Sequence, residues 1–214
     1  MATELDYQDV ARMLREGAFL LKANRDLLSQ LDSATGDGDH GATMCRIADA
    51  ILESTEPGAA ATVQALLESV GWSVLSVDGG SASPLAGSFL LGMAEGCPAA
   101  ARLNGDELAA AFESGLVRFR AQTLAQVGDK TMLDALAPAV EALGAAARQG
   151  LGAEEILARA AAAARQGAEA TKPLQAKFGR ARNLGPRSVG FADPGATSIS
   201  LLFAGFHAAF RASK

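Results

Sequence analysis

Apolar residues recur at the spacing of an α-helix along most of this 214-residue chain. Near the start they occupy every third or fourth position between Val10 and Leu31, which predicts one long amphipathic helix that ends near Asp32. Alanine and leucine, which favour helices, dominate the later segments, and alternating runs of valine, isoleucine, threonine and aromatic residues are missing. The sequence therefore predicts an all-α fold and no credible β-strand.

The same pattern predicts eight helices in all, without an internal repeat or a linker. After the first helix, the others are expected at about residues 43–53, 60–77, 85–96, 105–122, 131–149, 153–172 and 196–212. A chain of this length with 49% hydrophobic residues can bury a substantial core, and it suits one domain better than two. We therefore expect a single domain over residues 1–214.

The charge balance argues against several kinds of partner. A formal net charge of −5 does not suit nucleic acid or an anionic membrane, since both need clustered lysine and arginine. One long uncharged stretch, residues 79–94, is rich in glycine and serine and falls short of the roughly 18 apolar residues that span a membrane. Residues 1–6 do not resemble a signal peptide, and Cys45 and Cys97 are too few for a disulfide framework, so we expect a cytoplasmic protein.

Four loops between the predicted helices carry more polar residues than a connection requires. They cover residues 32–41, 78–84, 127–131 and 178–195, and each contains glycine. Loops that are held by a rigid helical scaffold commonly carry binding residues. The sequence therefore predicts a site assembled from loops at the helix ends.

The loop at residues 32–41 points most directly to a metal. It places three carboxylates, those of Asp32, Asp37 and Asp39, within eight residues. Gly36, Gly38 and Gly41 permit tight and left-handed turns, so the three side chains can face one point. Converging carboxylates repel one another unless a cation lies between them, and hard oxygen ligands select magnesium or calcium. Aspartates beside glycines also serve as helix caps and turn formers, which is the alternative interpretation of these residues.

Three familiar motifs do not fit this loop. Residues 36–41 match the glycine pattern of a dinucleotide fingerprint, but they follow a predicted helix and would place two aspartates against the pyrophosphate. A calcium-binding EF-hand that began at Asp37 would need glutamate where Ala48 stands. The Gly-Lys dipeptide of a phosphate-binding P-loop occurs nowhere in the chain. A nucleotide would therefore need another kind of site.

Four blocks of this sequence together resemble the signature blocks of the nucleotide-binding (L) subunit family of dihydroxyacetone kinases. They are residues 32–44, 79–85, 128–134 and 179–198, in the order and at the spacing of that family. The resemblance spans nearly the whole chain. It implies an antiparallel eight-helix barrel whose loops at one end hold a nucleotide, ADP or ATP, and two Mg²⁺ ions.

The resemblance also implies roles for individual residues. Metal ligation is expected from Asp32, Asp37 and Asp39, in agreement with the interpretation of the carboxylate loop. The residues expected to contact the nucleotide are His40, Gly41, Ala42, Thr43, Ser81, Ala82, Met132, Arg180, Asp193, Pro194 and Gly195. No residue of this chain is expected to act as nucleophile or base, because the family holds its sugar on a histidine of a separate K subunit.

The chain departs from the family at several positions. Thr43 stands where asparagine is common, and Ser81-Ala82-Ser83 stands where Ala-Ser-Gly is common. Asn183 replaces an aromatic residue, and Phe191 replaces a histidine. The three metal-binding aspartates are intact. These departures leave open which short ketose is the substrate, dihydroxyacetone or a relative such as erythrulose.

The resemblance thus predicts phosphoryl transfer from a magnesium-bound nucleotide to a ketose that a K-type partner subunit presents. The phosphate donor stays open between bound ADP that a phosphotransferase-system protein recharges and ATP that exchanges as a substrate. Two other functions are compatible with the same residues. One is a non-catalytic nucleotide-sensing module that binds a transcription regulator, and the other is a metal-stabilised helical scaffold without a nucleotide.

Overall fold

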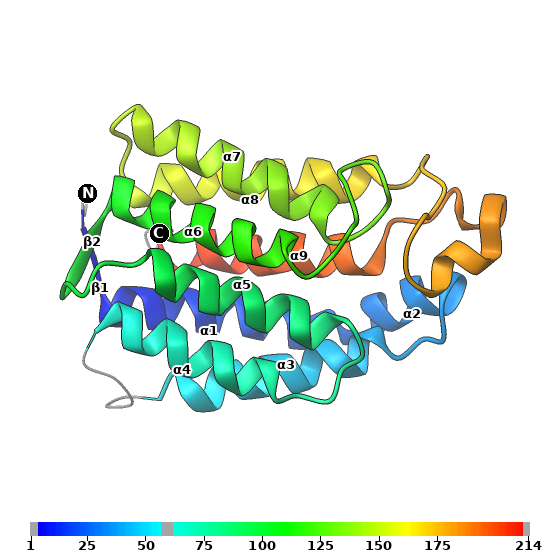
Figure 1. Ribbon diagram of the computed structural model, residues 1–214, viewed down its shortest axis with the longest axis horizontal. Coiled ribbons are helices and arrows are strands. Elements are labelled where there is room, and N and C mark those ends of the chain that lie inside the picture. Colours follow the sequence, from blue (N-terminus) through cyan, green and yellow to red (C-terminus); the bar gives the residue numbers. More distant parts are fainter. Residues whose placement is uncertain (1–3, 57–61, 212–214) are drawn as a thin grey trace.

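The computed structural model of the protein describes residues 4–56 and 62–211 (Figure 1). Within these residues the chain is mainly helical with almost no sheet, which confirms the all-α prediction. The α-helices are α1 (Tyr7–Ala23), α2 (Arg25–Thr35), α3 (His40–Ser54), α4 (Val63–Leu75), α5 (Ala82–Gly96), α6 (Gly105–Arg120), α7 (Leu133–Arg148), α8 (Ala153–Ala170) and α9 (Pro194–Ala208). A 3₁₀ segment, η1 (Arg180–Ser188), precedes α9.

The prediction of one long first helix is wrong, because the structure divides it into α1 and α2 at Asn24. The Asn24 side chain donates a hydrogen bond to the carbonyl oxygen of Leu20 (2.8 Å), and its backbone N–H also points back onto the last turn of α1. Asparagine commonly competes in this way with helical hydrogen bonding. The separate helix α2 then reaches the end of the molecule where η1 lies (Figure 1).

The prediction of no strand is also wrong. β1 (Glu4–Asp6) and β2 (Arg102–Asn104) pair in antiparallel orientation. Each strand has three residues, which is too short for a period of two to be visible in the sequence. Asp6 and Asn104 also cap α1 and α6 through capping boxes, so the strand pair fixes where these two helices begin.

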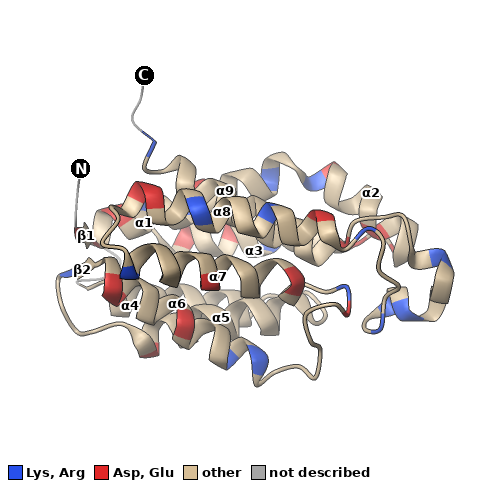
Figure 2. Ribbon diagram, turned by 90° about the horizontal axis from the view of Figure 1, so that it is seen from above, with Lys and Arg blue, Asp and Glu red and all other residues tan. Residues whose placement is uncertain are grey.

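Some predicted features lie outside the described residues. These are residues 60–61 at the start of the helix predicted at residues 60–77, residue 212 at the end of the last predicted helix, and residues 1–3 of the segment considered as a signal peptide. Along residues 4–56 and 62–211, no helix has both the length and the apolar character that crossing a membrane requires. Acidic and basic residues are interspersed over the outer faces of the helices (Figure 2).

The helices lie side by side along the long axis of the molecule (Figure 1). From α3 to α9 each helix contacts the next one in the sequence, and α1 contacts both α3 and α9. Their inward faces share one core, in which the rings of Phe112, Phe203 and Phe206 have centroids 5.3 to 6.1 Å apart. Neighbouring helices alternate in direction, so α3, α5, α7 and α9 all begin at the end that carries α2 and η1 (Figure 1).

Helices α1 and α9 touch backbone to backbone at two glycines. A Cβ atom added at Gly205 would lie 2.4 Å from the backbone nitrogen and Cα of Gly17. Backbone atoms cannot move aside as the end of a flexible side chain can. Glycine at this position therefore sets the separation of α1 and α9.

Gly205→Ala is expected to lower the free energy of unfolding by about 1–3 kcal/mol, the usual cost of overpacking a close contact. Gly144→Ala in α7 is the matched control, because its added Cβ would meet only the side-chain ends of Glu113 and Arg148. Alanine at that position should be neutral or should stabilise the helix by about 0.5–1 kcal/mol. Denaturant unfolding followed by circular dichroism measures both variants, and an unchanged stability of Gly205→Ala would contradict the tight α1–α9 contact.

Candidate functional site

The turn between α2 and α3 is held by the first of the three predicted metal ligands. The backbone carbonyl of Asp32 accepts a hydrogen bond from Gly36 N–H (2.5 Å), and its side-chain Oδ2 accepts one from His40 N–H (3.1 Å). Gly38 adopts a left-handed backbone with φ of 82°, and a Cβ there would lie 2.5 Å from Ser33 Oγ. Aspartate and glycine therefore fix this turn by local geometry.

The turn brings the three predicted ligands together. Carboxylate oxygens of Asp32, Asp37 and Asp39, one from each residue, all lie within 4.8 Å of one another. The guanidinium of Arg180 forms ion pairs with Asp37 and, at 3.7 Å, with Asp39. One arginine leaves two of the three negative charges uncompensated. A set of carboxylate oxygens with this charge fits a hard divalent cation such as Mg²⁺.

A cavity of about 700 Å³ opens beside these carboxylates, at the α2–η1 end of the molecule. Its volume falls in the range of small-molecule sites, roughly 300–1,000 Å³. It joins segments that are far apart in the sequence. The predicted residues that line it are Asp32, Asp37, Asp39, His40, Thr43, Ser81, Ala82, Met132, Arg180, Asp193, Pro194 and Gly195.

Two predicted nucleotide contacts, Gly41 and Ala42, do not line the cavity. Gly41 is buried, and a Cβ on it would lie 2.2 Å from the carbonyl oxygen of Arg25 and 2.4 Å from Ser29 Oγ. The glycine thus allows α3 to pack closely against α2. Ala42 is half-buried on the first turn of α3.

Four helices begin at the cavity. His40, Ala82 and Pro194 are the first residues of α3, α5 and α9, and Met132 immediately precedes α7. All four residues line the cavity. The N–H groups at a helix start carry partial positive charge and bind anions such as phosphate. The helix ends therefore supply positive potential in a protein whose net charge is negative.

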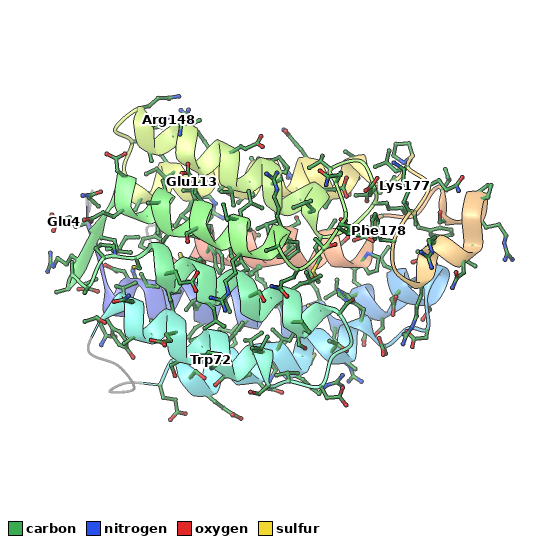
Figure 3. The ribbon with its side chains drawn as sticks, viewed as in Figure 1. Glu4, Trp72, Glu113, Arg148, Lys177 and Phe178 are labelled. Atoms are coloured by element: carbon green, nitrogen blue, oxygen red, sulfur yellow. The ribbon has the colours of Figure 1, made fainter. Side chains whose placement is uncertain are left out.

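Part of the cavity wall is formed by apolar residues that the sequence did not predict. Phe119, Ala125 and Phe178 line it together with Met132. Phe178 follows Lys177 at this end of the molecule (Figure 3). The missed segment includes Leu124 and Val127, which are 87% and 57% exposed in the loop after α6, and such apolar residues in a loop are the signal that could have drawn attention to it.

In the block at residues 128–134, the carboxylates of Asp129 and Asp134 stabilise the loop itself. Asp134 accepts hydrogen bonds from the N–H groups of Gly128 (2.6 Å) and Thr131 (2.7 Å). Asp129 accepts one from Gln126 N–H (2.8 Å) and pairs with Lys177 (2.7 Å), an interaction that holds the pKa of Asp129 below its usual value. These carboxylates fix the loop in front of α7, which positions Met132 at the cavity.

Two buried charges, Asp193 and Lys130, lie in the cavity wall. Asp193 caps α9 by accepting a hydrogen bond from Ala196 N–H (2.7 Å), and burial raises the pKa of its carboxyl to about 7. Lys130 is 2% exposed and donates hydrogen bonds to the carbonyl oxygens of Thr171 (2.8 Å) and Phe191 (2.6 Å). Burial lowers the pKa of Lys130, while the carboxylates of Asp193 and Asp134 oppose that change. Lys130 lies in the family block at residues 128–134, but no local pattern indicates its role.

His40 lies half-buried between the carboxylates and α9. Its Nε2 is 3.2 Å from Ser198 Oγ. Burial lowers the pKa of the imidazole, although the negative charges of Asp32 and Asp39 act in the other direction. A lowered pKa favours the neutral ring near pH 7, which can donate one hydrogen bond and accept another.

Comparison with known proteins shows the family of this chain. A family model described as the DAK2 domain matches residues 34–208. The ADP-binding subunit DhaL of the PEP-dependent dihydroxyacetone kinase of Escherichia coli is 34% identical over 183 residues, 86% of this chain and 87% of the relative. The ADP-binding subunit DhaL of PEP-dependent dihydroxyacetone kinase 2 of Listeria innocua is 34% identical over 207 residues, 92% of each chain.

Solved structures show the same fold. The native dihydroxyacetone kinase of C. freundii matches 93% of this chain with a TM-score of 0.71 at 26% identity. The same kinase in complex with AMP-PNP and Mg²⁺ gives a TM-score of 0.70. This chain spans about a third of that kinase, 34% of its length. Because the family model and the bacterial relatives each cover most of the sequence, the chain belongs to the DAK2 domain family.

Proposed function

We propose that this chain is the nucleotide-binding subunit of a ketose kinase, a phosphotransferase, and that its cavity binds ADP or ATP with two Mg²⁺ ions. One observation carries the proposal: three carboxylates and the starts of four helices face the same cavity of nucleotide size. The similarity to bacterial ADP-binding subunits supports the nucleotide, and the AMP-PNP and Mg²⁺ complex of the C. freundii kinase supports the metal.

Different residues of the cavity are proposed to bind the metal, the phosphates and the base. Asp32, Asp37 and Asp39 would hold the metal, which when bound supplies the positive charge that offsets the polyphosphate. The helix starts donate N–H groups to phosphate oxygens, and Arg180 adds a fixed cationic donor. Phe119 and the other apolar residues of the cavity wall offer a surface for the nucleotide base.

The acceptor sugar is proposed to come from a K-type partner subunit that holds dihydroxyacetone or a related ketose such as erythrulose. His40 lines the cavity, but its Nε2 already lies beside Ser198 Oγ. We therefore do not expect His40 to hold the sugar. For the donor, we infer bound ADP that a phosphotransferase-system protein recharges. The names of the relatives support this choice, since they describe PEP-dependent kinases and, in Lactococcus lactis, a PTS-dependent one.

Magnesium and nucleotide are expected to stabilise the fold together, because either one alone leaves like charges facing each other in the cavity. Thermal unfolding with Mg²⁺ alone, with ADP alone and with both measures this effect. The shift in Tm with both ligands should exceed the sum of the separate shifts. Shifts in Tm that simply add would argue against a shared site. An unchanged Tm in all three conditions would contradict the nucleotide proposal.

Asp37→Asn should weaken magnesium-dependent ADP binding by more than about tenfold, because loss of even a supporting residue at a metal site often costs that much. Helix content should not change, since Asp37 is exposed and contributes nothing to the core. Asp49→Asn is the control, an exposed carboxylate on α3 that pairs with Lys22. Calorimetry and circular dichroism test both variants, and a collapse of helicity in Asp37→Asn would favour the turn-forming interpretation.

The chain alone, incubated with dihydroxyacetone or erythrulose and either donor, should form no sugar phosphate until a K-type subunit is added. In-line transfer requires the acceptor hydroxyl within about 3–3.5 Å of the terminal phosphate, so the partner must reach the cavity end. Arg182 is exposed on η1 at this end, where basic residues gather (Figure 2). Arg182→Glu should therefore weaken association with the partner without affecting folding.

Arg148→Glu provides the control for this charge reversal, because Arg148 is exposed at the opposite end of the molecule (Figure 3). A coupled assay measures sugar phosphate, and a pull-down titration measures partner affinity. Turnover by the chain alone would refute the two-subunit mechanism. Equal partner affinity of both variants would place the docking surface elsewhere.

A further inference from the structure

The segment at residues 172–191, named the strap here, connects α8 to α9 and includes η1. It leaves the helical bundle and passes over the cavity end, where it contacts α2 (Figure 1). Its residues 178–181 line the cavity. Among them is Arg180, whose guanidinium pairs with Asp37 and Asp39. The position of this cation therefore depends on how the strap is held.

The two ends of the strap meet at a neck. The N–H of Gly190 donates a hydrogen bond to the carbonyl oxygen of Lys172 (2.8 Å). Just beyond them, the N–H of Asp193 donates to Thr171 Oγ1 (2.8 Å). A loop whose ends are joined in this way can be positioned as a unit by whatever holds its neck.

Lys130 holds that neck from the side of the bundle. Its Nζ donates hydrogen bonds to the carbonyl oxygens of Thr171 (2.8 Å) and Phe191 (2.6 Å). Thr171 immediately precedes the strap, and Phe191 is its last residue. The carboxylates of Asp193 and Asp134 are the charges that face the ammonium and stabilise it. The lysine side chain thus joins the start of the strap, its end and the loop before α7.

Two features of Lys130 are unfavourable in themselves. It is a charged residue that is only 2% exposed, and it is the one non-glycine residue with positive φ, 63°, within residues 4–56 and 62–211. A buried charge needs compensating partners, and a left-handed backbone is costly for a residue with a Cβ. Such features persist where the surrounding structure requires them and are concentrated at functional sites.

The same turn holds the strap at a second point. The backbone N–H of Lys177 donates to the carbonyl oxygen of Asp129 (3.1 Å), and its Nζ donates to the Asp129 carboxylate (2.7 Å). Lys177 precedes Phe178 and Arg180 closely in the strap. The turn at residues 128–130 therefore fixes both the neck of the strap and the part that reaches the cavity.

We propose that Lys130 is a positioning residue that clamps the neck of the strap and thereby sets Arg180 at the phosphate side of the cavity. Its effect on ligand binding rests on the proposed nucleotide-binding function. Its effect on the strap does not, because the clamp consists of contacts within the chain. Lys130 acts through Arg180, so removing the lysine should matter only as long as the arginine is present.

The test combines Lys130→Met and Arg180→Ala in a double-mutant cycle, with the dissociation constant of ADP measured by calorimetry in excess Mg²⁺. Each single variant should weaken binding by about tenfold, the lower range for residues that support a ligand-binding group. The double variant should bind no more weakly than Arg180→Ala. Independent effects that multiply to about a hundredfold would overturn the proposal, because Lys130 would then act on the nucleotide without Arg180.

Hydrogen exchange on the free protein provides a second readout that needs no nucleotide. In Lys130→Met the amide of Gly190 and its neighbours in the strap should exchange at least about tenfold faster, while the amides of α5 and α7 keep their protection. Unchanged strap protection would overturn the clamp. If the natural chain binds no ADP, the proposed function fails, yet the exchange experiment still decides whether Lys130 holds the strap.

Two further variants separate positioning from loss of folding. Lys130→Gly keeps the left-handed backbone of the turn and removes only the side chain, so it should reproduce the strap and binding effects of Lys130→Met. Lys172→Met is the matched control, because this exposed lysine at the neck pairs with Glu169 on the surface and should behave as the natural chain. A normal strap in Lys130→Gly would show that the amine does not hold the neck.

Discussion

The alternating direction of neighbouring helices is the constraint on which the whole site depends. Because α3, α5, α7 and α9 begin at the same end, their free N–H groups converge on one cavity (Figure 1). The carboxylates of Asp32, Asp37 and Asp39 come from the turn that enters the first of these helices. Aspartates alone would repel a polyphosphate, whereas the helix starts attract it. The proposed phosphate site of this acidic protein therefore rests on backbone dipoles, the carboxylate loop with its metal, and Arg180.

The sequence predicts best the features that arise from short segments. Helical periodicity identified most of the helices, because each pattern lies within one helix. The carboxylate loop could be predicted for the same reason. Asp32 and Asp39 lie close together in the sequence, in a segment whose glycines fix its path, and the structure brings their oxygens together. The assembly of Ser81, Met132 and Arg180 around that loop came only from the family resemblance, since no local pattern relates residues so far apart.

The features that escaped prediction depend on tertiary contacts or on one competing side chain. Asn24 ends α1 with a hydrogen bond that apolar periodicity does not register. Gly41 packs closely against the backbone of α2, a contact that its place in a family block does not reveal. The apolar wall around Phe119 and the buried amine of Lys130 become visible only when α6, the strap and α7 are placed together.

The strap departs from the family pattern where the carboxylate loop at residues 32–41 does not. Two departures from the family pattern, Asn183 and Phe191, lie in the strap, whereas the three aspartates are unchanged. Lys130 binds the backbone carbonyl of residue 191, and that group is present whichever side chain stands there. The clamp therefore tolerates Phe191 in place of histidine. Side-chain changes in the strap would then alter the proposed docking surface, while the backbone contacts at its neck keep Arg180 against the carboxylates.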